Sequence, residues 1–160
     1  MELDFEILKI FKVIFAIFLG GLIGLEREIA DKPAGLRTHM LVTGAAALLV
    51  ILGDTIVARF GASPYVEAVQ ADPIRIMEAI ITGISFLGAG TIIFKSQHET
   101  IEGLTTAASI LFASAIGITV GLDELGMASI LTVVVILILF VLGFVEGKVR
   151  KFKKHRSQEE

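Results

Sequence analysis

Two groups of ionisable residues border long apolar stretches of the sequence, and they are the residues best suited to carry chemistry. The first occupies positions 72–78, whose sequence is Asp-Pro-Ile-Arg-Ile-Met-Glu. Asp72 before Pro73 is typical of a helix start, because a carboxylate accepts the backbone N–H groups left free in the first turn and proline lacks one. Arg75 follows Asp72 by three residues and precedes Glu78 by three, so it can pair with either carboxylate on a helix.

Glu78 begins a polar stripe inside an apolar segment. With Thr82, Ser85 and Ala89 it repeats at helical spacing, which predicts a helix face that cannot favourably meet lipid. Asp54, near the end of the preceding apolar segment, is a plausible neighbour of Asp72 and Glu78. Magnesium sites commonly use one or two carboxylates and retained waters, so these three carboxylates form a candidate Mg²⁺ site. A structural ion pair between Glu78 and Arg75 is an equally good interpretation.

The second group lies between the first two apolar segments. Charges alternate from Glu26 and Arg27 to Arg37 and His39, and this pattern is also typical of a solvated turn beside the headgroups. His39 is either an interfacial residue or a titratable ring that senses pH or a ligand.

Five apolar segments have to position these groups. A membrane-spanning helix needs about 20 mainly apolar residues. The chain of 160 residues is 54% hydrophobic and only 19% charged, and it contains no cysteine, which excludes disulfides and thiolate chemistry. We therefore expect an all-α membrane protein, a bundle of five transmembrane helices. The predicted spans are Ile7–Leu25, Thr38–Val57, Ile76–Phe94, Leu104–Val120 and Leu125–Val145.

Basic residues predict the orientation. With the C-terminus in the cytoplasm, 10 Lys and Arg residues lie inside and 4 outside, which fits the positive-inside rule and puts the N-terminus outside. Residues 1–147 then form the transmembrane domain and 148–160 a basic cytoplasmic tail, either a stop-transfer flank or a segment lying on anionic lipid. The acidic leader Met1–Glu6 is unlike a cleaved signal, so we expect the first span to be retained.

Small residues predict where the helices pack closely. Gly20 and Gly24 have GxxxG spacing, and Thr106, Ser109, Ala113 and Gly117 line one side of the fourth segment. Two helix starts share the pattern Gly-Leu-x-Thr, and a run of small residues follows each of them. The segment before the first start is rich in glycine at Gly20 and Gly24, and the segment before the second at Gly83, Gly88 and Gly90, which predicts two hairpins related as parallel repeats. General enrichment of small residues in membrane helices explains the same pattern equally well.

Five ordered blocks closely resemble the MgtC/SapB family, from about Gly20 to Gly121. The blocks are GLIGLERE from Gly21, PAGLRTH from Pro33, DPIR from Asp72, GISFLGAGTI from Gly83 and GLTTAAS from Gly103. The resemblance implies a prokaryotic inner-membrane protein with five spans, linked to growth in low magnesium and, in pathogens, to survival inside host cells. The positions that carry it are Glu26, Arg27, Gly35, Arg37, Thr38, His39, Arg75, Gly88, Gly90, Thr105, Thr106 and Ser109.

Three departures from the family pattern qualify the resemblance. Met77-Glu78-Ala79 stands where relatives carry a small-small-Gln run, which makes Glu78 specific to a subgroup. Leu111 stands where a Trp is common, and we expect a short form without the ACT-like C-terminal domain of many relatives.

Two functional classes remain open. The first is a membrane protein that binds or moves a divalent cation in magnesium homeostasis. The second is a regulator without transport activity that packs against another membrane protein. We expect no enzyme, because no nucleophile with an adjacent base, phosphate-binding loop or HExxH motif is present. Nucleic acid is not an expected partner, and the small bundle predicts a homo-oligomer, by default a dimer.

Overall fold

Five α-helices make up the regular structure of the chain. The computed structural model describes residues 2–61, 73–93 and 103–156. Each predicted span overlaps one helix, which confirms the all-α class with five helices. The helices are α1 (Glu2–Ile29), α2 (Leu36–Gly61), α3 (Pro73–Ile93), α4 (Leu104–Gly121) and α5 (Leu125–Arg156).

The helix ends differ from the predicted spans mainly in α1 and α5. Helix α1 begins at Glu2, before the first predicted apolar residue, and α5 runs on to Arg156. Residues 148–156 contain neither Gly nor Pro and are mostly Lys and Arg, which are good helix formers. Helix α5 is therefore continuous across the predicted boundary between the transmembrane domain (1–147) and the basic tail (148–160). The division into these two regions stays a prediction.

Four of the helices are long and apolar enough to cross a membrane. Among the described residues these are α1 to α4, and the described apolar part of α5, Leu125–Val141, is shorter. The expectation of five spans is thus met in part. The repeat relationship between the first two hairpins stays a prediction.

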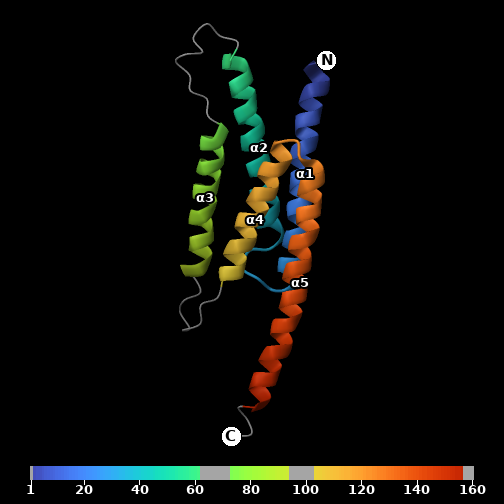
Figure 1. The fold of residues 1–160 in the computed structure, drawn as a ribbon, viewed down its shortest axis with the longest axis vertical. Coiled ribbons are helices and arrows are strands. Elements are labelled where there is room, and N and C mark those ends of the chain that lie inside the picture. The colour runs from blue at the N-terminus through green and yellow to red at the C-terminus, as the bar shows by residue number, and fades with distance from the viewer. Residues whose placement is uncertain (1, 62–72, 94–102, 157–160) are drawn as a thin grey trace.

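Helix α4 lies at the centre of the bundle. It packs against each of the other four helices, and α1 contacts α2, α4 and α5 (Figure 1). Ile116 and Val120 of α4 are fully buried together with Ala16 and Ile23 of α1 and Ala47 of α2. Helix α4 is the most buried of the candidate spans because four helices pack against it, although Leu111 and Phe112 on its remaining side are each 42% exposed.

Glycines let α1 and α4 approach α2 from two sides at Thr43. A methyl group at Gly20 of α1 would meet the Thr43 side chain, and one at Gly117 of α4 would meet the Thr43 carbonyl. At Gly24 the added carbon would lie 2.7 Å from the Leu36 Cα atom. Backbone contact of this kind replaces the hydrophobic drive that lipid cannot supply.

An ion pair fastens the turn between α4 and α5 to α1. The Lys12 ammonium lies 2.6 Å from an Asp123 carboxylate oxygen, and the Lys12 side chain is only 12% exposed. Asp123 has a φ of 69°, a left-handed conformation that Asp tolerates better than most residues. The pair therefore fixes where α4 and α5 begin to cover α1.

Helix α3 stands at the edge of the bundle. It packs against α2 and α4, on one side only (Figure 1). Only 11% of the residues in its apolar stretch are buried, against 56% in α4. A cavity of about 190 Å³ lies between α2 and α3. Helix α3 is thus the least enclosed of the four candidate spans.

Candidate functional site

A buried polar centre forms where α1 ends and where α2 and α4 begin. Arg27, His39, Thr43, Thr106 and Ser109 are each at most 3% exposed. Polar side chains are buried at low cost only when they are hydrogen bonded, so their partners define this site. The polar centre consists of Glu26 and Arg27 of α1, His39 and Thr43 of α2, and Thr106 and Ser109 of α4.

His39 connects two helices through both of its ring nitrogens. Nδ1 lies 2.9 Å from the carbonyl oxygen of Gly35, and Nε2 lies 3.0 Å from the Ser109 Oγ atom. Because a carbonyl only accepts, Nδ1 carries a proton. The Ser109 hydroxyl also lies 2.8 Å from the Thr106 carbonyl. When the His39 ring is neutral, the single hydroxyl hydrogen of Ser109 can be donated either to Nε2 or to the Thr106 carbonyl. When the ring is charged, Nε2 donates to Ser109 Oγ, the Ser109 hydroxyl donates to Thr106, and Nδ1 donates to Gly35, so all three hydrogen bonds form.

The pair of Ser109 and His39 has the hydrogen bond of a nucleophile and its base, but not their accessibility. His39 is 0% exposed and Ser109 3% exposed. A catalytic nucleophile must meet its substrate in a productive geometry, which this burial prevents. We interpret the pair as a tie between α2 and α4.

Arg27 is neutralised by its own neighbour. Its Nη2 atom donates to a Glu26 carboxylate oxygen at 2.6 Å, and its Nε atom donates to the other oxygen. The Arg27 side chain is 4% exposed and that of Glu26 14%. A buried guanidinium needs such a charged partner, and both charges lie close enough to act on His39.

Glu28 at the end of α1 is hydrogen bonded to the first residue of α2. Its carboxylate accepts a hydrogen bond of 3.0 Å from the backbone N–H of Leu36, the first residue of α2. A side chain at Gly35 would overlap this carboxylate. Glu28 therefore caps α2 from the previous helix, where a negative charge favours the helix dipole.

The remaining family positions lie outside the polar centre. Arg37 and Thr105 are exposed, and Thr38 is partly buried. Gly88 of α3 is buried, and a Cβ atom added there would lie 3.4 Å from the Ala107 Cβ atom of α4. At Gly83 and Gly90 no described atom would lie within 4 Å of an added Cβ. Close approach within the chain therefore occurs at Gly20, Gly24 and Gly117 but not at Gly83. Ala113 is fully buried in α4.

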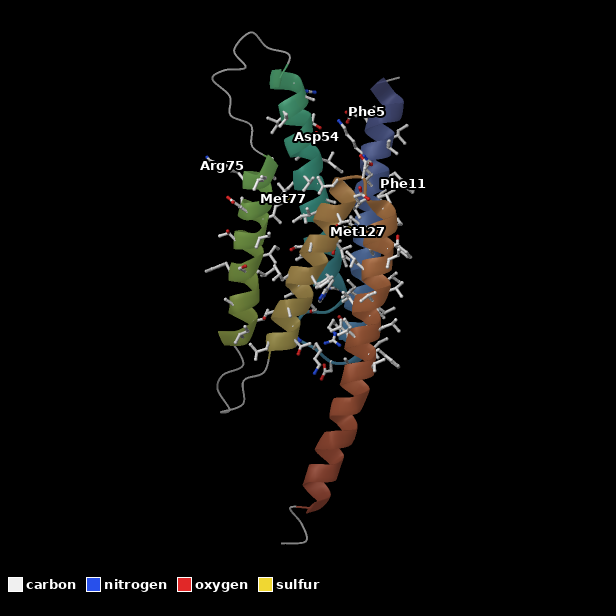
Figure 2. The ribbon with its side chains drawn as sticks, viewed as in Figure 1. Phe5, Phe11, Asp54, Arg75, Met77 and Met127 are labelled. Carbon is white, nitrogen blue, oxygen red and sulfur yellow. The ribbon has the colours of Figure 1, made fainter. Side chains whose placement is uncertain are left out.

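The predicted carboxylates of the outer group do not gather in the described part of the chain. Asp54 on α2 and Glu78 on α3 are exposed, and Asp72 falls outside the described residues. No group of three or more possible metal ligands is found among the described side chains. Figure 2 shows Arg75 pointing away from α2, on the side of α3 opposite Met77. Neither Arg75 nor Glu78 pairs with a described residue, and the Mg²⁺ site stays a prediction.

The polar stripe of α3 faces away from the bundle. Glu78, Thr82, Ser85 and Ala89 are all exposed, and Phe86 beside them is 85% exposed. The opposite side of α3 buries Ile80 against α2 and α4. We call the outward set of Glu78, Thr82, Ser85, Phe86 and Ala89 the α3 polar face.

Three features of the site were not visible in the sequence. Glu28 as a cap, Thr43 as the point where two glycines meet α2, and the Lys12–Asp123 pair all depend on tertiary contacts. No helix-start signal marks Glu28, because it lies in the last turn of α1, eight residues before Leu36.

Comparison with known proteins agrees with the sequence blocks. Residues 13–148 match the MgtC family. The chain is 39% identical to the "Putative magnesium transporter YhiD" of Escherichia coli K12, covering 84% of this chain and 62% of the relative. It is 35% identical to "Protein SapB" of Bacillus subtilis over 92% of this chain and 61% of the relative. It is 37% identical to "Protein MgtC" of Brucella abortus over 76% of this chain and 45% of the relative.

These relatives are longer than the region they share with this chain. The chain spans 45–62% of their length. No solved structure matches it. The match runs from within α1 to within α5, and together with the relatives it shows that this chain belongs to the MgtC family of multi-pass membrane proteins.

Proposed function

We propose that this chain serves divalent-cation homeostasis as a membrane regulator that packs its α3 polar face against a spanning helix of another membrane protein. The observation that carries the proposal is the outward direction of that face. Glu78, Thr82 and Ser85 are exposed on a helix that is otherwise apolar enough to cross a membrane. Ionisable residues in membrane helices almost always face protein or water.

Phe86 gives this face the composition of a contact site. It is 85% exposed beside the polar stripe. Buried aromatic anchors surrounded by polar positions dominate the energy of many protein interfaces. No described atom lies within 4 Å of a carbon added at Gly90, so a partner backbone can approach α3 closely there, whereas Gly83 lines the cavity shared with α2.

A partner of different sequence suits the face better than a second copy. A symmetric parallel pair of α3 helices would place Glu78 opposite Glu78, and like charges at close range are unfavourable. A helix that offers Lys, Arg or a hydroxyl instead satisfies the carboxylate. Crosslinking from Ser85 in the membrane tests this difference, because adduct mass separates a second copy from another protein.

The link to magnesium comes from the relatives. The Escherichia coli relative carries the name of a putative magnesium transporter, and that name belongs to the longer protein. For this chain it supports magnesium homeostasis as the physiological setting. The interior supports regulation over transport, because the polar centre is closed by internal hydrogen bonds.

Divalent-cation binding is the second candidate. Asp54, towards the end of α2, and Glu78, near the start of α3 beside Arg75, are exposed carboxylates. Glu78 has no partner among the described residues. A carboxylate without a partner is free to bind Mg²⁺ through retained waters. Asp72 would be the third ligand.

The proposed setting is the inner membrane of a prokaryote with all five helices spanning. The N-terminus then lies outside, and the polar centre and the end of α5 lie on the cytoplasmic side. The count of basic residues supports this orientation.

A further inference from the structure

The outer halves of α1 and α2 form a groove that the other described helices leave open. Helix α2 has 26 residues and α4 has 18, so α2 is longer by about 12 Å at a rise of 1.5 Å per residue. The start of α1 and the end of α2 extend beyond the turn between α4 and α5 (Figure 1). The Lys12–Asp123 pair joins that turn to α1, and no described helix fills the space beyond the turn.

The groove has an apolar wall and a charged end. Its volume is about 470 Å³, and its walls include Ile10, Val13 and Ile14 of α1 and Leu48, Leu52 and Ile56 of α2. Glu6, Lys9 and Arg59 line it at the end where α1 begins and α2 stops. Polarity therefore changes along the helix axes, from charged at the membrane surface to apolar at depth.

The two basic side chains differ in how they are held. The Lys9 ammonium donates to a Glu6 carboxylate oxygen at 3.2 Å and lies 4.7 Å from the centre of the Phe5 ring. Arg59 is exposed and has no hydrogen-bond or ion-pair partner among the described residues. With Glu6 counted, two positive charges and one negative leave this end of the groove with a net charge of +1.

We propose that this groove binds an anionic phospholipid, with its phosphate at Arg59 and Lys9 and an acyl chain along the apolar walls. A guanidinium can donate two hydrogen bonds to one phosphate, and Lys9 retains N–H groups not used by Glu6. Basic pockets between membrane helices are known to take anionic headgroups by the same chemistry. The site does not depend on the proposed role of α3.

The size of the groove favours a lipid chain over a protein helix. Pockets for small molecules measure about 300–1,000 Å³, a range that includes this groove. A helix about 10 Å wide and 30 Å long occupies roughly 2,400 Å³. A helix could only rest on the opening, where it would bury Arg59 without a phosphate to pair with it.

The absence of tryptophan makes a fluorescence test direct. The chain contains no Trp, so a single introduced indole reports only its own surroundings. Leu52→Trp places the reporter in the groove, and Ile138→Trp places a control on the exposed surface of α5. Both proteins are reconstituted in phosphatidylcholine vesicles containing either brominated phosphatidylglycerol or brominated phosphatidylcholine. Quenching then measures which lipid contacts each position.

The proposal predicts preferential quenching by phosphatidylglycerol at Leu52→Trp and equal quenching by the two lipids at Ile138→Trp. Arg59→Gln in the Leu52→Trp protein should lower the preference about fivefold, which is the scale for one basic residue at an anionic surface. Arg75→Gln, an exposed arginine outside the groove, should leave it unchanged. Added salt should weaken the preference as well.

Three results would overturn the lipid site. Equal quenching by both lipids at Leu52→Trp would show ordinary bilayer contact without selection. Quenching by neither lipid there, with normal quenching at Ile138→Trp, would show that protein covers the groove. A preference that survives Arg59→Gln would place the headgroup elsewhere. Leu48→Trp repeats the measurement from the same groove if the first reporter fails to fold.

Discussion

Nε2 of His39 on α2 lies 3.0 Å from Oγ of Ser109 on α4, although 70 residues separate them in the chain. Both side chains are buried, and only folding brings the first turns of α2 and α4 together at this contact. The bond fixes the rotation of α2 against the central helix, and it anchors the polar centre.

Ser109→Ala should therefore destabilise the protein by about 1–3 kcal/mol, because it leaves a buried ring nitrogen without a partner. The free energy of unfolding in detergent measures this loss. Ser114→Ala is the matched control, since Ser114 is also buried and its hydroxyl, within the described part of the chain, donates to the Leu111 carbonyl of its own helix and to no other helix. Equal losses in the two variants would contradict the tie between helices.

Gly117→Ala and Gly126→Ala should change stability in opposite directions. A methyl group at Gly117 meets the Thr43 backbone and the Ala46 Cβ atom, so overpacking should cost about 1–3 kcal/mol. At Gly126 nothing lies within 4 Å, and Ala should gain up to about 1 kcal/mol of helix propensity. Thermal unfolding of both purified variants checks the sign. A Gly117→Ala protein as stable as the unchanged chain, or more stable, would show that α4 and α2 do not touch at Gly117.

If this chain acts as a regulator and binds no divalent cation, added magnesium should not raise the melting temperature of the purified protein. A ligand that binds the folded state raises its apparent stability, so a Mg²⁺ site would shift the melting temperature at millimolar ion. The cation candidate predicts such a shift, its loss in Glu78→Gln and its retention in Glu124→Gln, another exposed carboxylate. A shift with that dependence would replace the regulator proposal by the cation site.

Reporter fusions should place the two ends of the chain on opposite sides of the membrane. A fusion after Glu160 is expected to report cytoplasm and one before Met1 the outside, because 10 basic residues fall on the inner side and 4 on the outer. Two fusions that report the same side would mean that an even number of helices spans the membrane, with α5 as the helix that does not.

The helices could be predicted because their apolar runs are long and well separated. The extent of α5 could not, since hydropathy marks where lipid ends and not where a helix of Lys and Arg stops. The stripe from Glu78 to Ala89 was visible as a polar face, but its direction depends on which side of α3 meets α4. Likewise His39 and Ser109 were each identified, and only the packing of α2 on α4 brings them together.

Site-specific photocrosslinking in living membranes tests the central claim most directly. A benzophenone amino acid replaces Ser85 on the α3 polar face or, as the control, Leu137 on the exposed side of α5. We predict a protein adduct from position 85, of a mass other than twice 17.2 kDa, that Phe86→Ala weakens and that position 137 does not form. No protein adduct at position 85, the same adduct at both positions, or an adduct of two copies of this chain would contradict the proposal.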